Sequence, residues 1–361
     1  MVERWIYKDV VPFAGMVAAE CATVGSNTGF KAATAAGITY YVFTLYVAVV
    51  AAAALLPVAL IFRRRSPSPK LPPHKISFFF KIVCLSALGL SCQLFGNKGL
   101  EYSSPNLSSA ISNLIPAFTF VLAIFFRMEK VAFKKSSSIA KMVGSAVSIS
   151  GALVVVLYKG PIVISNPYSE GPKDHTLGSS QSQPNWILGG LCFVFQYVCN
   201  SLWYILQTQI IKIYPDELSV LAVYYVIQAL LTAPVCLLAE TDINAWKLTT
   251  PLHFLLLLNS GLVGQCFVAS IHTWGLGLKG PVYVSSFRPL SIAIAAAMGA
   301  ILLGDDLHLG SIIGAIIISV GFYGILWGKA KEEELKELEH VGTLESSSKA
   351  PLLQCYKVED A

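Results

Sequence analysis

Residues 38–62 read ITYYVFTLYVAVVAAAALLPVALIF and contain no charged side chain. An α-helix rises about 1.5 Å per residue, so about 20 apolar residues are enough to cross the hydrocarbon core of a bilayer. A helix on the surface of a soluble protein would show a polar stripe at helical period, whereas this run is apolar on every side. The stretch therefore predicts a transmembrane helix.

Nine more segments of the chain have the same character. They are about residues 10–30, 76–97, 105–126, 139–158, 186–211, 218–239, 252–278, 280–304 and 307–328. Charged residues make up 13% of the chain, whereas a soluble domain carries about 25%. This is too little charge to cover a water-facing surface. We therefore expect an all-α integral membrane protein with ten transmembrane helices.

The basic residues between these segments predict how the chain is oriented. With the amino terminus in the cytosol, thirteen lysines and arginines lie in cytosolic loops or at their edges and five on the opposite side. The densest cytosolic cluster is Arg63, Arg64 and Arg65. Because loops rich in Lys and Arg stay on the cytosolic side, both termini are predicted to be cytosolic. The short basic clusters also fit membrane orientation better than a nucleic-acid surface, so no nucleic-acid partner is expected.

Similar sequence markers recur in the two halves of the chain. The paired markers are Gly144-x6-Gly151 with Gly314-x6-Gly321, and Pro116 with Pro289. Five helices per half is an odd number, so the second half must enter the membrane from the opposite face. This arrangement is an inverted-topology repeat, which recurs among secondary transporters.

The expected organisation has four parts. They are a first five-helix repeat (10–158), a non-cytosolic linker rich in Pro, Ser and Gly (159–185), a second five-helix repeat (186–328) and a cytosolic tail (329–361). The tail is expected to begin as a short solvated helix and then to become disordered.

Several longer stretches resemble a known plant family. They are Met16-Val-Ala-Ala-Glu20-Cys, Asn27-Thr-Gly-Phe-Lys31-Ala-Ala, Tyr40-Tyr-Val-Phe, Asn113-Leu-Ile-Pro116-Ala-Phe-Thr-Phe, Phe126-Arg-Met-Glu-Lys130, Leu157-Tyr-Lys-Gly-Pro161, Gly280-Pro-Val-Tyr-Val and Leu307-His-Leu-Gly-Ser-Ile-Ile-Gly314. The chain resembles the EamA-type drug/metabolite transporters, and among them the nodulin-21-like, Walls-Are-Thin-related proteins that include the amino-acid UmamiT type. The resemblance implies two EamA-like repeats and bidirectional movement of amino acids or, in some members, auxin. Many relatives have Gln at the position of Glu20 and Asn at that of Arg288.

Two ionisable residues lie inside the predicted transmembrane helices, Glu20 in the first and Arg288 in the ninth. A charge in hydrocarbon costs at least about 2.5–3.5 kcal/mol and usually marks a functional site. We expect both to face one cavity, with Arg288 binding a substrate carboxylate and Glu20, Trp203 or Tyr225 meeting its ammonium group. Glu20 is also a candidate proton carrier. The structural alternatives are a snorkelling or backbone-bound Arg288, a protonated hydrogen-bonded Glu20, and a buried salt bridge between them.

Neutral polar residues recur on single faces of other predicted helices. The candidate substrate-binding or coupling residues are Glu20, Asn27, Gln93, Asn97, Asn113, Gln196, Asn200, Trp203, Tyr225, Gln265 and Arg288. Each one alone is as readily explained by an interhelical hydrogen bond. Together they predict a polar interior, which a simple membrane anchor would not need.

The sequence favours a secondary transporter over other classes of membrane protein. His253, His272 and His308 are too widely spaced to predict a metal site, and no ATP-binding or hydrolase motif appears. A membrane enzyme would need clustered His, Asp or Glu, and a channel would need filter rings in an oligomer. We expect alternating-access transport of small organic solutes, most specifically amino acids, with auxin or another organic anion as the alternative. No cofactor is expected, and the expected partners are the substrate and the bilayer.

The tail suggests where the protein resides. Pro351-Leu352-Leu353 resembles an endosomal or vacuolar dileucine signal, although its acidic partner Glu345 lies further upstream than usual. Chance leucines in a disordered tail are an equally good explanation. The plasma membrane is the default expectation and the vacuolar membrane the alternative.

Overall fold

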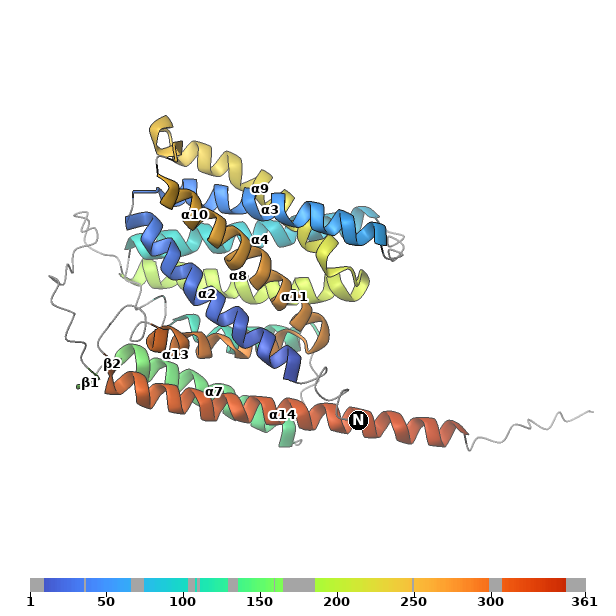
Figure 1. The fold of residues 1–361 in the computed structure, drawn as a ribbon. Coiled ribbons are helices and arrows are strands. Elements are labelled where there is room, and N and C mark those ends of the chain that lie inside the picture. The colour runs from blue at the N-terminus through green and yellow to red at the C-terminus, as the bar shows by residue number, and fades with distance from the viewer. Residues whose placement is uncertain are drawn as a thin grey trace, which may run out of the picture.

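The computed structural model describes residues 10–35, 37–65, 75–102, 108, 111–128, 136–158, 160–164, 186–248, 250–298 and 307–348. Its longer helices lie side by side along a common direction (Figure 1). The helices are α2 (Val11–Ala35), α3 (Tyr40–Arg65), α4 (Lys75–Tyr102), α6 (Ile115–Phe125), α7 (Ser136–Leu157), α8 (Trp186–Ile213), α9 (Glu217–Ala239), α10 (Pro251–Asn259), α11 (Val268–Leu278), α12 (Pro281–Ser286), α13 (Arg288–Met298) and α14 (Leu309–Ser348).

Short irregular elements complete the fold. A 3₁₀ turn, η2 (Ile243–Trp246), precedes α10, and a π-helical segment, η3 (Ser260–Phe267), joins α10 to α11. The strands β1 (Ile162–Ile164) and β2 (Leu307–His308) pair in antiparallel fashion. They lie at the end of the bundle where α7 finishes and α14 begins (Figure 1).

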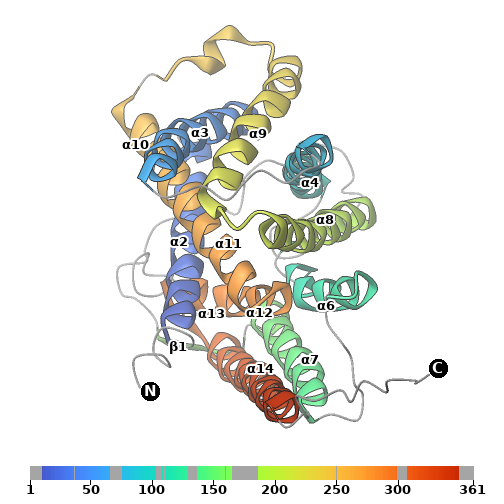
Figure 2. The same ribbon diagram turned by 90° about the vertical axis from the view of Figure 1, so that its right-hand side faces the viewer.

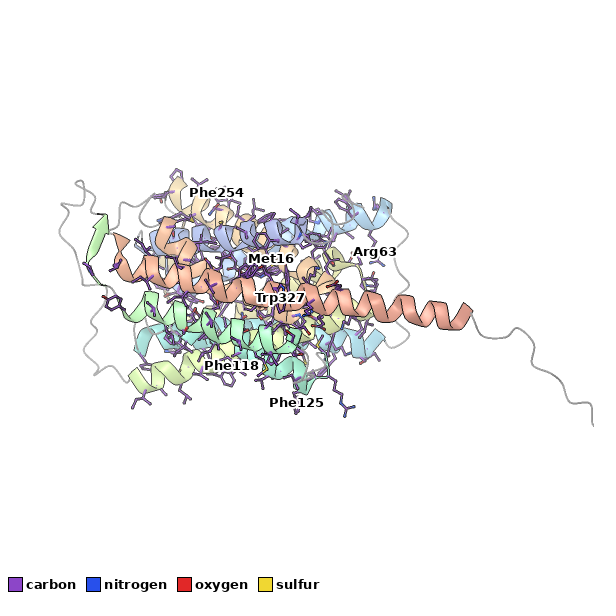
Figure 3. The ribbon with its side chains drawn as sticks, turned by 90° about the horizontal axis from the view of Figure 1, so that it is seen from below. Met16, Arg63, Phe118, Phe125, Phe254 and Trp327 are labelled. Carbon is purple, nitrogen blue, oxygen red and sulfur yellow. The ribbon has the colours of Figure 1, made fainter. Side chains whose placement is uncertain are left out.

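Seven of the described helical spans are long and apolar enough to cross a membrane. They are Tyr40–Arg64, Ile76–Gly96, Ser136–Val154, Ile187–Ile213, Glu217–Ala239, Pro251–Leu278 and Ile312–Glu332. Large apolar side chains such as Phe125 (79% exposed) and Phe254 (57%) point outward, whereas Met16 is fully buried (Figure 3). An exposed apolar shell around a buried interior is what lipid contact requires. The chain is therefore a multi-pass helical membrane protein.

Helix α14 differs from its predicted extent. The sequence predicted a span over 307–328 followed by a short helical extension, whereas α14 continues to Ser348. The extension projects beyond the bundle (Figure 1). Its Lys- and Glu-rich sequence contains good helix formers and no proline, so nothing local ends the helix at the membrane boundary. The predicted dileucine signal at Leu352–Leu353 lies outside the described residues.

Two of the predicted spans are interrupted where the sequence has a proline. The fourth predicted span turns at Asn113 and Leu114 before α6 starts at Ile115. The ninth is divided into α12 and α13 by a turn at Phe287, immediately before Arg288 and Pro289. Proline has no N–H to donate and disfavours helical geometry in the residue before it. The two breaks therefore follow from Pro116 and Pro289, which lie within segments that the sequence predicted as single spans.

The helices α7 and α14 form a tight pair at one side of the bundle (Figure 2). A Cβ atom on Gly144 would lie 2.6 Å from the backbone oxygen of Gly321, and one on Gly151 would lie 2.7 Å from the nitrogen of Ile318. Residue numbers rise along α7 as they fall along α14, so the helices are antiparallel. The glycines of the repeated sequence marker thus allow direct backbone contact between the ends of the two halves.

Candidate substrate-binding site

A cavity of about 320 Å³ lies among α2, α4, α8, α9, η3, α11 and the start of α13. Its polar lining consists of Thr23, Ser26, Asn27, Gln93, Asn200, Trp203, Tyr204, Tyr224, Tyr225, Ser260, Gln265, His272 and Arg288. An adjoining space of about 220 Å³ shares Gln93, Tyr225 and Gln265 with it and extends to Tyr40 in the first turn of α3. The two spaces form one path from the interior toward the α2–α3 end of the bundle.

Arg288 is positioned by the break between α12 and α13. It is the first residue of α13, and its Nε donates a hydrogen bond of 3.0 Å to the hydroxyl oxygen of Tyr204 on α8. The Arg288 side chain is 23% exposed and lines the cavity. Because Nε is occupied by Tyr204, the terminal nitrogens of the guanidinium are the part that can face a ligand.

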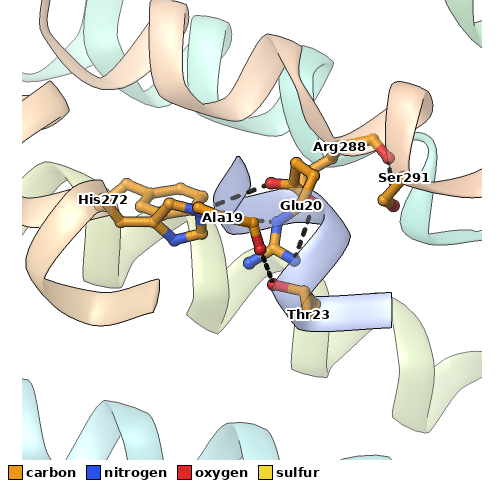
Figure 4. A network of polar contacts seen from close by, with 7 residues as sticks. Ala19, Glu20, Thr23, His272, Arg288 and Ser291 are labelled. Carbon is orange, nitrogen blue, oxygen red and sulfur yellow. Dashed lines mark hydrogen bonds and ion pairs between the residues drawn. The ribbon is translucent and has the colours of Figure 1, made fainter. Parts of the chain in front are cut away.

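Glu20 lies next to Arg288 but behind the cavity wall. Its side chain is completely buried on α2 and is not among the lining residues. Glu20 Oε2 is 4.0 Å from Nη1 of Arg288, and Oε1 is 3.4 Å from Nε2 of His272 on α11. Figure 4 shows the three side chains converging from separate helices. This geometry brings together the two charges that the sequence singled out and adds His272 to them.

An aromatic and amide wall continues from the charged cluster. The hydroxyl group of Tyr225 on α9 donates a hydrogen bond of 2.9 Å to Oε1 of Gln265 in η3. The ring of Trp203 lies edge-on to Tyr204 and to Tyr224, with ring centroids 5.7 and 5.9 Å apart. A π-helical segment is a common device for placing a side chain at a functional site, and here it directs Gln265 into the cavity.

The far end of the path is aromatic. Phe30, at the carboxyl-terminal part of α2, packs edge-to-face against Tyr40 and Phe43 of α3, with centroids 5.5 and 5.1 Å apart. All three line the adjoining space. The path thus has a charged end at Arg288 and an aromatic end at Phe30, and it joins them through amides and phenols. We call Glu20, His272 and Arg288 the charged floor, and Phe30, Tyr40 and Phe43 the aromatic lobe.

Seven of the eleven sequence-predicted residues line the cavity. They are Asn27, Gln93, Asn200, Trp203, Tyr225, Gln265 and Arg288. Asn113 is instead fully buried at the break before α6, and Gln196 packs against Gly96 of α4. Asn97 belongs to α4, and its side chain lies outside the described part of the structure.

The sequence prediction missed Tyr204 and gave His272 little weight. Tyr204 follows Asn200 by four residues on α8, so it continues the polar face that Gln196 and Asn200 begin. That spacing was the available signal. His272 was weighed as a metal ligand, and the sequence could not show that its neighbour would be Glu20.

The apolar layer next to the charged floor closes the cavity on its inner side. Tyr204 belongs to a buried cluster with Met16, Leu276, Val284 and Phe287. One turn further along α8, Gln207 donates a buried hydrogen bond of 3.1 Å to Thr273. A small polar molecule entering from the aromatic lobe would therefore stop at Arg288. The arrangement can hold a ligand but has no paired nucleophile and base in position for covalent chemistry.

Comparisons with known proteins identify the family to which the chain belongs. Residues 14–157 match the EamA-like transporter family. Three WAT1-related proteins of Arabidopsis thaliana are 50%, 49% and 46% identical to the chain over 360, 357 and 373 residues. The alignments cover 99%, 99% and 100% of this chain and 95%, 97% and 100% of the relatives. One crystal structure, 13% identical, superposes with a TM-score of 0.61 over 89% of this chain and 99% of its own.

The fold and the site define a multi-pass membrane protein with an internal polar cavity. At this level of identity over the full length, the chain belongs to the WAT1-related family of plant EamA-like transporters. Membership of this family makes it a membrane transporter of small solutes.

Proposed function

We propose that the protein is a secondary transporter or facilitator of amino acids that works by alternating access. One observation favours this most strongly: a single guanidinium, Arg288, lines the closed end of a polar cavity, and its side chain is 23% exposed although Nε bonds Tyr204 and Nη1 lies 4.0 Å from Glu20. Guanidinium groups bind carboxylates in bidentate fashion. The amino acid's ammonium group would then lie against the faces of Trp203 or Tyr225, which attract cations, and against the amide oxygen of Gln93.

The same proposal includes ten transmembrane passes in two inverted repeats. We take α2, α3, α4, α6 and α7 as the first repeat and α8, α9, α10–α11, α12–α13 and α14 as the second, in corresponding order. Three corresponding pairs contact each other directly: α3 with α9, α6 with α12, and α7 with α14.

Other contacts come in matched couples, as a pseudo-twofold axis requires. Helix α4 packs on α8, and its counterpart α11 packs on α2; α6 packs on α8, and its counterpart α13 packs on α2. The breaks before Ile115 and at Phe287 also fall in corresponding helices. Interrupted helices at equivalent positions of two repeats are typical of transporter binding sites.

Alternating access would interchange the open and closed ends of the cavity. In the present conformation the path reaches Tyr40, while the layer around Met16 and Phe287 closes the other side. With both termini in the cytosol, the open end faces away from the cytosol. Arg63, Lys212 and Lys279 lie at the ends of α3, α8 and α11, at the opposite end of the bundle, which supports this orientation.

The experiment that tests the function is uptake and efflux by the purified full-length protein in liposomes. We would measure a radiolabelled panel of amino acids and auxin, with and without a pH gradient. Saturable exchange of amino acids that is lost in Arg288→Ala supports the proposal. Absence of amino-acid exchange while another organic anion is transported would overturn it.

A second substrate class is favoured by the aromatic lobe. An organic anion with an aromatic body, such as auxin, would place its carboxylate at Arg288 and its ring near Phe30 and Phe43. The same transport panel separates the two classes.

The proposal includes no bound cofactor for either substrate class. It places the transporter in the plasma membrane, with the vacuolar membrane as the alternative.

A further inference from the structure

The charged floor contains one carboxylate that lies next to one guanidinium and one imidazole. Glu20, Arg288 and His272 come from α2, α13 and α11, and Glu20 contacts both of the others. An ionised Glu20, a charged Arg288 and a neutral His272 have no net charge. In a medium of low dielectric this balanced state is strongly preferred to one with an excess charge.

Among the described residues that line the cavity, no other group is charged near neutral pH. The remaining ionisable residues that line the cavity are Cys92, Tyr204, Tyr224 and Tyr225. Thiols and phenols are uncharged near neutral pH. The side chains that line the cavity from α2 and η3 are Thr23, Ser26, Asn27, Phe30, Ser260 and Gln265, which do not ionise. Any charge brought by a ligand must therefore be balanced by the ligand itself or by the Glu20–His272 pair.

We propose that the charge of the substrate decides whether a proton binds with it. A monocarboxylate adds one negative charge, which a proton taken up from water by the Glu20–His272 pair neutralises. A zwitterionic amino acid brings its own ammonium group and needs no proton. The carboxylate stays ionised on Arg288 throughout, and release of the anion returns the proton to water. This inference rests on the proposed function in taking the cavity as the substrate site.

The location of Glu20 supports a proton-binding role over direct contact with substrate. Its carboxylate is fully buried behind Arg288, so a ligand in the cavity meets the guanidinium first. When a substrate carboxylate approaches Arg288, Glu20 competes with it for the same positive charge. The imidazole nitrogen 3.4 Å from Oε1 of Glu20 can hold a proton in place of the weakened ion pair.

Two ligands with the same skeleton make the test direct. Phenylalanine is zwitterionic near neutral pH, and phenylpropionate is the same molecule without its amino group. Binding of each to the full-length protein is measured by calorimetry from about pH 6 to about pH 8, in buffers of different ionisation enthalpy, so that proton uptake is counted.

The two ligands should differ in how steeply their binding affinity depends on pH. Phenylpropionate should take up one proton and bind up to about tenfold more weakly for each unit of rising pH. Phenylalanine should take up none and bind equally across the range. Equal proton uptake by both ligands, or no proton uptake with phenylpropionate, overturns the inference. This test needs only the wild-type protein. If phenylalanine fails to bind while phenylpropionate binding is proton-linked, the amino-acid function is wrong and the inference stands.

A neutral replacement of Glu20 gives an independent check. Glu20→Gln imitates a protonated Glu20, so phenylpropionate should bind without proton uptake and as tightly at high pH as at low pH. If Glu20 only supports the structure, the variant should bind phenylpropionate more weakly, with the same dependence of affinity on pH as the wild type. This result would overturn the inference. The matched control is Glu240→Gln, which removes a carboxylate beyond the end of α9, outside the cavity, and should leave the slope unchanged.

Discussion

The α7–α14 pair and the cavity are built by opposite means. Between α7 and α14, glycines bring backbone against backbone, and Lys141 forms a 2.6 Å ion pair with Glu332 near the end of the contact. Around Arg288, by contrast, large polar and aromatic side chains surround empty space. The α7–α14 contact leaves no room for a solute. The region around Arg288 encloses a cavity of about 320 Å³ that is lined by polar side chains.

This contrast indicates different roles for the α7–α14 pair and for the helices around the cavity. Close glycine contact gains dispersion energy that lipid cannot replace, so the α7–α14 pair is suited to hold the halves together. The helix breaks leave backbone polar groups without partners in their own helix, and these groups must be satisfied by other parts of the protein or by a hydrated cavity. Substitutions in the pair should therefore change stability, and substitutions around the cavity should change transport.

The largest effect is expected at Arg288. Arg288→Ala leaves Glu20 buried without its cation and removes the carboxylate-binding group, and such losses cost about 2–5 kcal/mol. Transport of carboxylate substrates should fall to background, while Arg288→Lys retains the charge and part of the activity. Uptake into liposomes measures both. Lys247→Ala, at an exposed lysine after η2, is the control, and an equal loss there would show that the effect is not specific to the cavity.

The next effect is expected in the α7–α14 pair. In Gly321→Ala the added methyl group would strike the backbone nitrogen of Ser148. Overpacking of this kind costs about 1–3 kcal/mol, so the melting temperature should fall by several degrees while substrate selectivity is unchanged. Thermal unfolding in detergent is the measurement. Gly25→Ala, where nothing lies within 4 Å of the new atom, should be neutral or stabilising, and equal loss in both variants would contradict the close contact.

A smaller effect is expected in the aromatic lobe. Phe30→Leu removes the edge-to-face contacts with Tyr40 and Phe43, which are worth about 1 kcal/mol. Affinity for phenylalanine should fall about fivefold, and affinity for alanine should not change, because a methyl side chain does not reach the lobe. Competition of each amino acid against a labelled substrate measures the ratio. Equal losses for both would place the side-chain pocket elsewhere.

The smallest effect is expected at Tyr225. Tyr225→Phe keeps the ring but removes the hydrogen bond to Gln265, whose net contribution is about 1 kcal/mol or less. The KM should rise about fivefold at most, with little change in kcat, because Gln265 would be held less rigidly. Initial-rate kinetics test this. A complete loss of transport would mean that the Tyr225 hydroxyl group itself binds substrate.

Part of the site could be predicted because burial of charge is costly wherever it occurs. Glu20 and Arg288 stood out as ionisable residues in apolar segments, and the structure places them 4.0 Å apart between atoms Oε2 and Nη1. Asn113 and Gln196 had the same polar appearance but do not line the cavity. A polar residue facing another helix and one facing a cavity have the same local sequence pattern, so periodicity could not distinguish them.

The sequence by itself determined the lipid environment and the helical class, because the hydrophobicity and length of each segment are local properties. It also contains the local cause of the helix breaks, the prolines Pro116 and Pro289, which act on their own backbone. Only the tertiary structure decided that His272 and Tyr204 join Glu20 and Arg288, that Gln265 enters the cavity through a π-helical turn, and that one end of the path is aromatic. These features depend on how helices rotate and cross, and many distant contacts together set those angles.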